Sequence, residues 1–124
     1  MNSATTYRRP DRVAQQILQI LGEIASRNID LSALGFVTFT SVRITSDLKQ
    51  AKVFFSVIQP KPNFEVVTRK LNRLSSAFRK YMGPALRIKF TPELIFIHDE
   101  SLEYSEKMNR LLSDLHPPRD ENDS

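Results

Sequence analysis

Two extended runs of residues constrain the fold of this chain more than any other feature. Residues 36–44 (FVTFTSVRI) and 51–58 (AKVFFSVI) are rich in β-branched and aromatic side chains, which favour strands. The six residues between them, TSDLKQ, include several that form turns. Because strands joined by so short a connection pair antiparallel, the sequence predicts a β-hairpin.

Helical patterns lie on both sides of this predicted hairpin. Pro10 suits a first helical turn, and apolar residues then recur at helical spacing, which predicts a helix over residues 10–26. These apolar residues are Val13, Ile17, Ile20, Leu21 and Ile24. Beyond the hairpin a proline-rich segment stops the second strand. Asn63 can then cap a second helix, which we expect to end at Gly83 and Pro84.

Two further elements complete the predicted order. Residues 86–90 and 94–98 are short extended runs on either side of Pro92, which predicts one edge strand bent at the proline. Residues 100–115 begin with acids and repeat apolar side chains, which predicts a last helix. These side chains are Leu102, Met108, Leu111, Leu112 and Leu115. The order α-β-β-α-(α)-β-α predicts an α+β domain with helices packed on a three-stranded sheet.

Length and composition bound the class of protein. The 124 residues suit one domain, expected over residues 8–116 between a flexible segment 1–7 and an acidic, disordered tail 117–124. The absence of cysteine excludes disulfides and thiolate metal sites. The N-terminus lacks the apolar core of a signal peptide, and no apolar run approaches the roughly 20 residues of a membrane span. We therefore expect a cytoplasmic monomer with no membrane contact.

Charge is distributed unevenly along the chain. Residues 43–89 hold eleven Lys and Arg against two acids, a balance of +9, whereas acids dominate the residues that follow. Such segregation suggests a polyanionic partner on one face. A basic surface that serves only solubility explains the numbers equally well, so charge alone leaves both interpretations open.

The predicted second helix helps to decide between these interpretations. On a helical wheel Arg69, Arg73 and Lys80 fall within roughly 40° of one another. Lys70 and Arg79 flank them, and an apolar stripe lies opposite, made of Leu71, Leu74, Phe78 and Met82. A merely solvated helix face usually mixes both signs of charge, whereas no acid interrupts this stripe. The pattern therefore favours an anion-binding face.

Motifs for catalysis or metal binding are absent from the sequence. It contains no HExxH, P-loop, GxGxxG or GxSxG motif, so we expect neither an enzyme nor a cofactor, metal ion or small-molecule substrate. His98, Asp99 and Glu100 could be read as metal ligands. A histidine at the end of a strand, followed by acids that cap a helix, explains these three residues better.

Several short motifs follow one another in a specific order along the chain. They are Arg9-Pro10-x-Arg12-Val13-Ala14, Val37-Thr38, Ser46-Asp47-Leu48-x-x-Ala51-Lys52-Val53, Leu86-Arg87-Ile88, Pro92-Glu93-Leu94, Asp99-x-Ser101 and Leu111-Leu112. In order and spacing they resemble the ribosome-binding factor A family, over about residues 8–115. The resemblance implies a type II KH-like domain.

That resemblance also implies a function. It describes an assembly factor that binds the free, immature small (30S) ribosomal subunit through its rRNA. Such a factor supports late maturation, including processing at the 5′ end of 16S rRNA, and growth in the cold, without being a nuclease. The alternative from the residues alone is a small α+β module that senses a ligand, or whose basic helix docks an acidic protein.

The resemblance directs attention to the middle of the basic helix. Nucleic-acid-binding KH domains generally carry a GxxG loop, which this sequence lacks. The family that it resembles also lacks this loop, and has an Ala-x-Gly kink between its second and third helices. The corresponding triplet is Ser75-Ser76-Ala77, in which serine hydroxyls can bond nearby backbone and bend a helix. We therefore predict a kink at Ser75, Ser76 and Ala77.

We expect rRNA to be recognised by its shape and phosphates rather than by base sequence. The aromatic residues of the hairpin could instead stack on bases, although most of them are expected in the core: Phe36, Phe39, Phe54 and Phe55. The candidate RNA-binding residues are Arg8, Arg9, Arg12, Arg69, Lys70, Arg73, Ser75, Ser76, Arg79, Lys80, Arg87 and Lys89.

Overall fold

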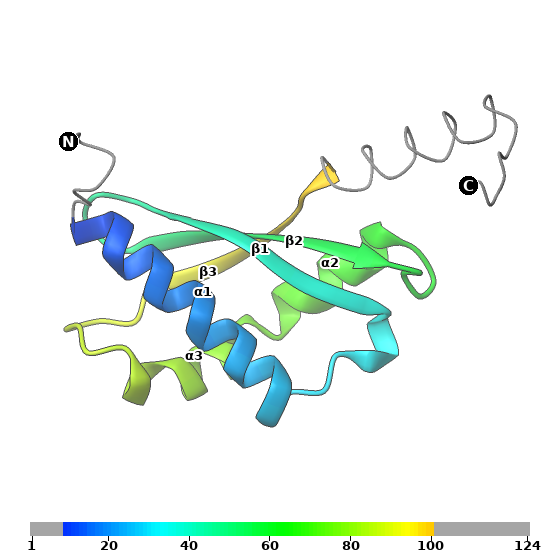
Figure 1. The fold of residues 1–124 in the computed structure, drawn as a ribbon, viewed down its shortest axis with the longest axis horizontal. Coiled ribbons are helices and arrows are strands. Elements are labelled where there is room, and N and C mark those ends of the chain that lie inside the picture. The colour runs from blue at the N-terminus through cyan, green and yellow to red at the C-terminus, as the bar shows by residue number, and fades with distance from the viewer. Residues whose placement is uncertain (1–8, 101–124) are drawn as a thin grey trace, which may run out of the picture.

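In the computed structural model, residues 9–100 are described, and their helices and strands follow the predicted order (Figure 1). The elements are α1 (Arg9–Arg27), the 3-10 helix η2 (Ser32–Leu34), β1 (Phe36–Ile44), β2 (Gln50–Ile58), α2 (Phe64–Arg73), α3 (Ser75–Ala85) and β3 (Glu93–His98). The α+β class and the hairpin are therefore confirmed. The predicted last helix, the N-terminal segment and the acidic tail lie outside the described residues.

The three strands form one mixed sheet in the order β1-β2-β3. β1 and β2 pair antiparallel, with one irregularity of register between Phe39 and Ser41. β3 pairs in parallel with β2, beginning with Glu93 opposite Gln50. Because neighbouring parallel strands need a crossover connection, α2 and α3 carry the chain from the end of β2 back to the start of β3.

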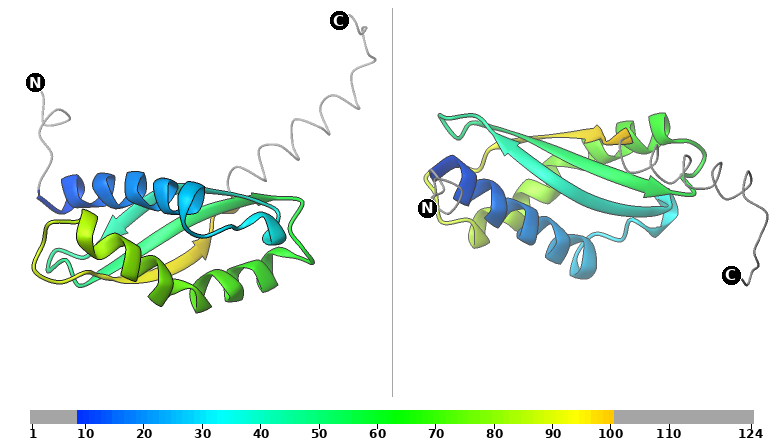
Figure 2. Two further views of the ribbon diagram at one scale, coloured as in Figure 1. Left: turned by 90° about the horizontal axis from the view of Figure 1, so that it is seen from below. Right: turned by 45° about the horizontal axis from the view of Figure 1, so that its top comes forward.

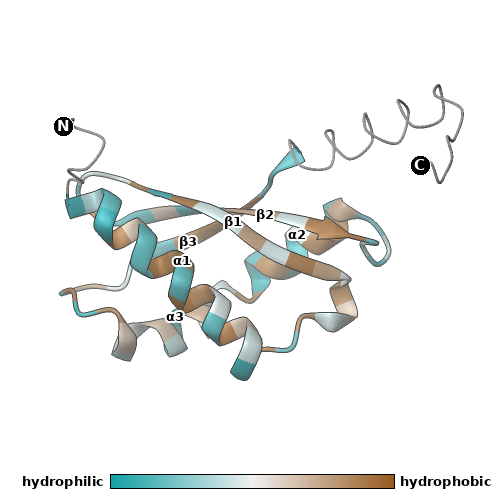
Figure 3. Ribbon diagram, in the orientation of Figure 1, coloured by the Kyte–Doolittle hydropathy of each residue, from teal (hydrophilic) through white to brown (hydrophobic). Residues whose placement is uncertain are grey.

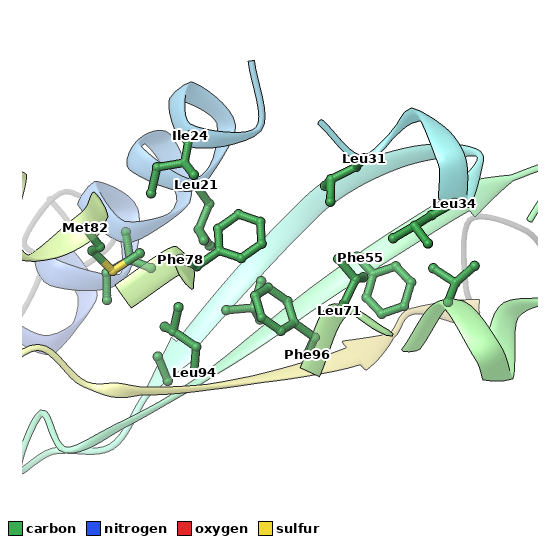
Figure 4. Packing of buried hydrophobic residues seen from close by; sticks show 14 of the residues in the cluster. Leu21, Ile24, Leu31, Leu34, Phe55, Leu71, Phe78, Met82, Leu94 and Phe96 are labelled. Atoms are coloured by element: carbon green, nitrogen blue, oxygen red, sulfur yellow. The ribbon is translucent and has the colours of Figure 1, made fainter. Parts of the chain in front are cut away.

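The three α-helices of residues 9–100 lie on one face of this sheet (Figures 1 and 2). Hydrophilic and hydrophobic residues alternate along α1, as an amphipathic helix requires (Figure 3). Apolar side chains from both layers point toward one another between the helices and the strands (Figure 4). The buried ones labelled there are Leu21, Ile24, Leu31, Leu34, Phe55, Leu71, Phe78, Met82, Leu94 and Phe96.

Three phenylalanine rings join different elements inside this core. The Phe78 ring on α3 lies 5.3 Å from the ring of Phe96 on β3 and 5.8 Å from that of Phe39 on β1, centroid to centroid. Burying a side chain of this size stabilises the fold by about 1.5–3 kcal/mol. The cluster therefore fixes α3 against both edges of the sheet.

The phenylalanines of the hairpin divide between core and surface. Phe55 is fully buried and Phe39 packs against the core, as expected. Phe54 is half-buried on the opposite face of the sheet, where the guanidinium carbon of Arg43 lies 5.9 Å from its ring centroid. Phe36 is 68% exposed, because it begins β1 on the face of the sheet that none of the described helices covers. Phe39 and Phe55 are therefore the only two of the four in the core, and the expectation that most of them lie there is wrong.

The start of α2 confirms the predicted cap. The side-chain oxygen of Asn63 accepts a hydrogen bond from the Val66 N–H at 3.0 Å, which satisfies one of the free amides of the first turn. The end of α3 differs from the prediction, because the helix continues through Gly83 and Pro84 to Ala85. A proline in the last turn removes only one amide donor, and the amide of Leu86, two residues later, still donates to the Met82 carbonyl at 2.9 Å.

The predicted strand over residues 86–90 does not form. β2 begins at Gln50, which pairs with Glu93, so residues before Glu93 have no strand opposite them. Leu86 is instead buried in the core, and Pro92 is buried just before β3. Only the second of the two predicted runs is therefore a strand.

Candidate nucleic-acid interface

The basic helix predicted from the sequence is two helices that meet at Leu74. The Leu74 N–H donates to the carbonyls of Lys70 (3.1 Å) and Leu71 (3.0 Å) and so closes α2. Its own carbonyl accepts from the Phe78 N–H at 2.9 Å and so opens α3. The break lies one residue before the predicted kink at Ser75, Ser76 and Ala77, which form the first turn of α3.

The reason for this position is a contact across the fold. The Ser75 hydroxyl donates to the backbone carbonyl of Leu94 on β3 at 2.9 Å. A serine hydroxyl that bends a helix usually bonds the carbonyl one turn earlier in the same helix. Here it bonds a strand instead, so the corner is fixed by tertiary structure and the serine is inside α3 rather than at the break.

Ser75 belongs to a row of three polar side chains that we call the β3 clasp: Asn72, Ser75 and Arg79. The amide of Asn72 donates to the Phe96 carbonyl (3.0 Å) and accepts from the Phe96 N–H (2.9 Å). The Arg79 guanidinium donates to the carbonyls of Pro92 and Thr91, each at 3.0 Å. β3 is an edge strand, and the clasp satisfies backbone groups that an open edge would leave unpaired.

This clasp changes the interpretation of two candidate RNA-binding residues. The hydroxyl proton of Ser75 is already used within the protein. Arg79 uses its Nε and one terminal nitrogen on the loop before β3, although its side chain remains exposed. Both residues hold α3 against the sheet, a role that the basic stripe alone did not reveal.

The other candidates on this pair of helices have exposed side chains. They are Arg69, Lys70 and Arg73 on α2, and Ser76 and Lys80 on α3. Neither helix contains an acid after Glu65. Because the helix breaks at Leu74, these cations do not form one continuous stripe. They form a basic group on α2 and a single lysine on α3, on either side of the corner.

The remaining candidates come from α1 and from the connection between α3 and β3. Arg9, Arg12, Arg87 and Lys89 are exposed, whereas Arg8 lies outside the described residues. Three chain segments converge at this end of the molecule: the start of α1, the β1–β2 turn and the α3–β3 connection (Figures 1 and 2). Their convergence brings Arg9 and Lys89 to the same cleft.

This cleft, which we call the end cleft, has a volume of about 240 Å³. It is lined by Arg9, by residues 47–49 of the turn and by residues 88–90 of the connection. Sequence reasoning selected Arg9 and Lys89 as binding residues but not the other lining residues, which are Asp47, Leu48, Lys49, Ile88 and Phe90. No local pattern groups these residues into one site, because the topology of the fold brings them together.

Hydrogen bonds hold the turn at the end cleft. The Thr45 hydroxyl donates to the Asp47 carboxylate at 2.6 Å, and the Lys49 N–H donates to the same oxygen at 3.0 Å. These bonds, that of Thr45 first, lower the pKa of Asp47 below its ordinary value, so the carboxylate stays ionised at neutral pH. The turn holds Leu48 at a φ of 62°, a left-handed conformation that is uncommon for a bulky residue.

The His98 side chain packs against aromatic rings at the end of β3. Its ring stacks on Phe64 at 4.3 Å between centroids and lies 5.5 Å from the ring of Phe55. Within residues 9–100 no three His, Cys, Asp or Glu side chains are grouped so that they could hold a metal ion. Over the same residues no helix is both long and apolar enough to cross a membrane.

The order α-β-β-α-α-β, with β3 parallel to β2 and α1, α2 and α3 on one face of the sheet, defines a type II KH-like domain. The family model described as ribosome-binding factor A matches residues 9–112. Ribosome-binding factor A of Legionella pneumophila (strain Paris) is 34% identical over 121 residues, which cover 97% of both chains. The chain belongs to the ribosome-binding factor A family.

Solved structures carry the same fold. The solution structure of a putative ribosome-binding factor A from Thermotoga maritima matches with a TM-score of 0.66 and 28% identity, over 82% of this chain and 93% of that one. A homology model of the Thermus thermophilus factor, fitted into a cryo-electron microscopy map of its complex with the 30S subunit, has a TM-score of 0.61 and 20% identity. It covers 73% of this chain and 96% of that model.

Proposed function

We propose that this protein is an assembly factor that binds the free, immature small ribosomal subunit through its rRNA. In this role it supports late maturation, including processing at the 5′ end of 16S rRNA, and catalyses no reaction itself. The observation that carries the proposal is an exposed basic surface on the helix pair, with no acid after Glu65, in a chain that belongs to the ribosome-binding factor A family. The related Thermus factor, fitted into a 30S complex, supports the choice of partner.

The proposed mechanism is recognition of folded rRNA by phosphate position and shape. Double-stranded RNA offers a protein mainly its wide minor groove and its phosphates. The exposed cations of α2 and α3 would contact these phosphates, and the hydroxyl of Ser76 would bond the sugar-phosphate backbone at the corner. The clasp ties the backbone of the corner to β3, so the positions from which the cations project are set before binding, which lowers the cost of ordering this segment on association.

Co-sedimentation tests the proposed partner. The protein is expected to migrate with free small subunits through a sucrose gradient and to be absent from complete ribosomes. Recovery with neither particle would overturn the proposal and favour a module that docks an acidic protein. Accumulation of 16S rRNA with an unprocessed 5′ end in cells that lack the protein is the second expected result.

Salt dependence tests the electrostatic part of the mechanism. If about five phosphates are neutralised, the logarithm of the association constant should fall with the logarithm of salt concentration with a slope of about −4. Titration of labelled protein with purified small subunits at several salt concentrations measures this slope. A slope close to zero would contradict phosphate recognition by the basic helices.

A further inference from the structure

We propose that the end cleft binds one unstacked base of an RNA strand, with the adjoining phosphates held by the surrounding cations. This inference rests on the proposed function but assigns a separate site, on the opposite end of α3 from the break at Leu74. The phosphate contacts proposed above lie on α2 and on α3 beside the break, whereas the end cleft combines apolar and cationic side chains.

The lining of the cleft matches the two halves of a nucleotide. Leu48 and Ile88 are half-buried and pack against the core, so they form a fixed apolar floor. The cations Arg9 and Lys49 lie at the same cleft, together with Lys89. The face of a base can pack on an apolar floor, and the cations can donate hydrogen bonds to the phosphates on either side of that base.

Phe90 supplies an aromatic surface for stacking. Its side chain is 73% exposed, the largest exposure among the exposed large hydrophobic residues of the described chain. The ammonium of Lys89 lies 5.5 Å from the centroid of its ring. Base–aromatic stacking is a general means of holding single-stranded nucleic acid, and neighbouring cations add to it. An exposed phenylalanine that lines the same cleft as a lysine and two apolar side chains is suited to this use.

Two features of the cleft argue against other ligands. Its volume of about 240 Å³ is below the roughly 300–1,000 Å³ typical of pockets for drug-sized molecules, which favours a single flat ring. The ionised carboxylate of Asp47 lines the cleft beside the cations and would repel a bare anion such as phosphate. A base with an exocyclic amino group can instead donate a hydrogen bond to that carboxylate.

The turn is built to hold its part of the cleft in place. Leu48 adopts its left-handed conformation inside a turn. The turn is closed by a hydrogen bond of 3.0 Å from the Thr45 N–H to the Gln50 carbonyl. The carbonyl of Lys49 also accepts from the Glu93 N–H at 2.9 Å, which ties the turn to the start of β3. Strained residues that the surrounding structure holds in place often mark functional sites.

Replacement of Phe90 by alanine in the full-length chain tests the proposal. Affinity for a labelled single-stranded RNA of about five nucleotides should fall about tenfold or more, as the loss of one stacked base predicts. The salt slope should not change, because no charge is removed. Phe90→Trp should restore binding. The matched control is Phe36→Ala, which removes a comparably exposed phenylalanine, 68% against 73%, from the other end of β1 and should bind as the wild type does.

Amide and methyl NMR signals identify the bound site. RNA should perturb the signals of Leu48, Ile88 and Phe90, and free AMP or UMP should perturb them only at much higher concentration. Unchanged affinity of Phe90→Ala, perturbations confined to α2, or equally tight binding of a free mononucleotide would each overturn the assignment. If one of these three results is obtained while the wild-type protein co-sediments with free small subunits, only the inference about the cleft fails. If the wild-type protein does not co-sediment with free small subunits, the proposed function fails.

Discussion

Replacing Arg73 and Lys80 together by glutamate is expected to abolish association with the small ribosomal subunit and to leave the fold intact. Both side chains are exposed, and they lie on either side of the break at Leu74. A hydrogen bond to a charged group contributes about 1.5–3 kcal/mol. Loss of two such contacts corresponds to an affinity decrease of about 100-fold or more, and the introduced repulsion adds to it. Surface changes of this kind alter stability by about 0.5 kcal/mol or less.

The double variant Arg43→Glu/Lys52→Glu is its matched control. These two residues face each other across β1 and β2, on the side of the sheet opposite the helices, and both are exposed. Each double variant takes the formal net charge from +4 to zero, because two cations become two anions. Co-sedimentation and a thermal melt should show that only Arg73→Glu/Lys80→Glu loses binding. Equal loss in both variants would mean that total charge, rather than the helix pair, determines association.

The features that were predicted correctly from sequence are those that local patterns determine. The spacing of apolar residues predicted α1, the runs of β-branched residues predicted the hairpin, and Asn63 predicted the start of α2. Each of these signals lies within one element, or in two elements joined by a short turn. Local rules are sufficient there, because the tertiary structure agrees with them.

The features that sequence reasoning missed depend on residues far apart in the chain. The break at Leu74 is set by the bond from Ser75 to Leu94, and Arg79 is directed toward the loop before β3 by carbonyls that no periodicity marks. The run over residues 86–90 has the composition of a strand but no partner, because β2 starts at Gln50. The end cleft likewise exists only once three distant segments converge.

Arg79 shows why a charge pattern on a helical wheel can count more cations as available for binding than the fold leaves exposed without a protein partner. A helical wheel places Arg79 beside the basic stripe, yet its guanidinium donates to two backbone carbonyls of the same chain. An arginine has five donors, so it can serve the fold and still present the rest to a ligand. Lys80, one residue later, is exposed on α3. Of these two neighbouring cations, Arg79 is therefore partly engaged by the backbone before β3, a difference that the helical wheel does not show.

Replacing Asn72 by alanine is expected to destabilise the protein by about 2 kcal/mol, which lowers the melting temperature by roughly 10 °C. The Asn72 amide bonds both the N–H and the carbonyl of Phe96, and its removal leaves two part-buried backbone groups at the edge of β3 without a protein partner. Alanine has a higher helix propensity than asparagine, so the change alone would strengthen α2. A net loss of stability therefore reports on the clasp.

Ser76→Ala is the control, since it alters an exposed side chain four positions later and should change stability by about 0.5 kcal/mol or less. Thermal unfolding measures both variants, and hydrogen exchange locates the effect. The Phe96 amide, whose acceptor is the Asn72 side chain, should exchange faster in Asn72→Ala, whereas the Val53 amide in the central strand should follow global stability. Unchanged protection of the Phe96 amide would show that β3 keeps its edge without the Asn72 bonds. The corner that presents the basic residues would then be held by Ser75, Arg79 and the phenylalanine core.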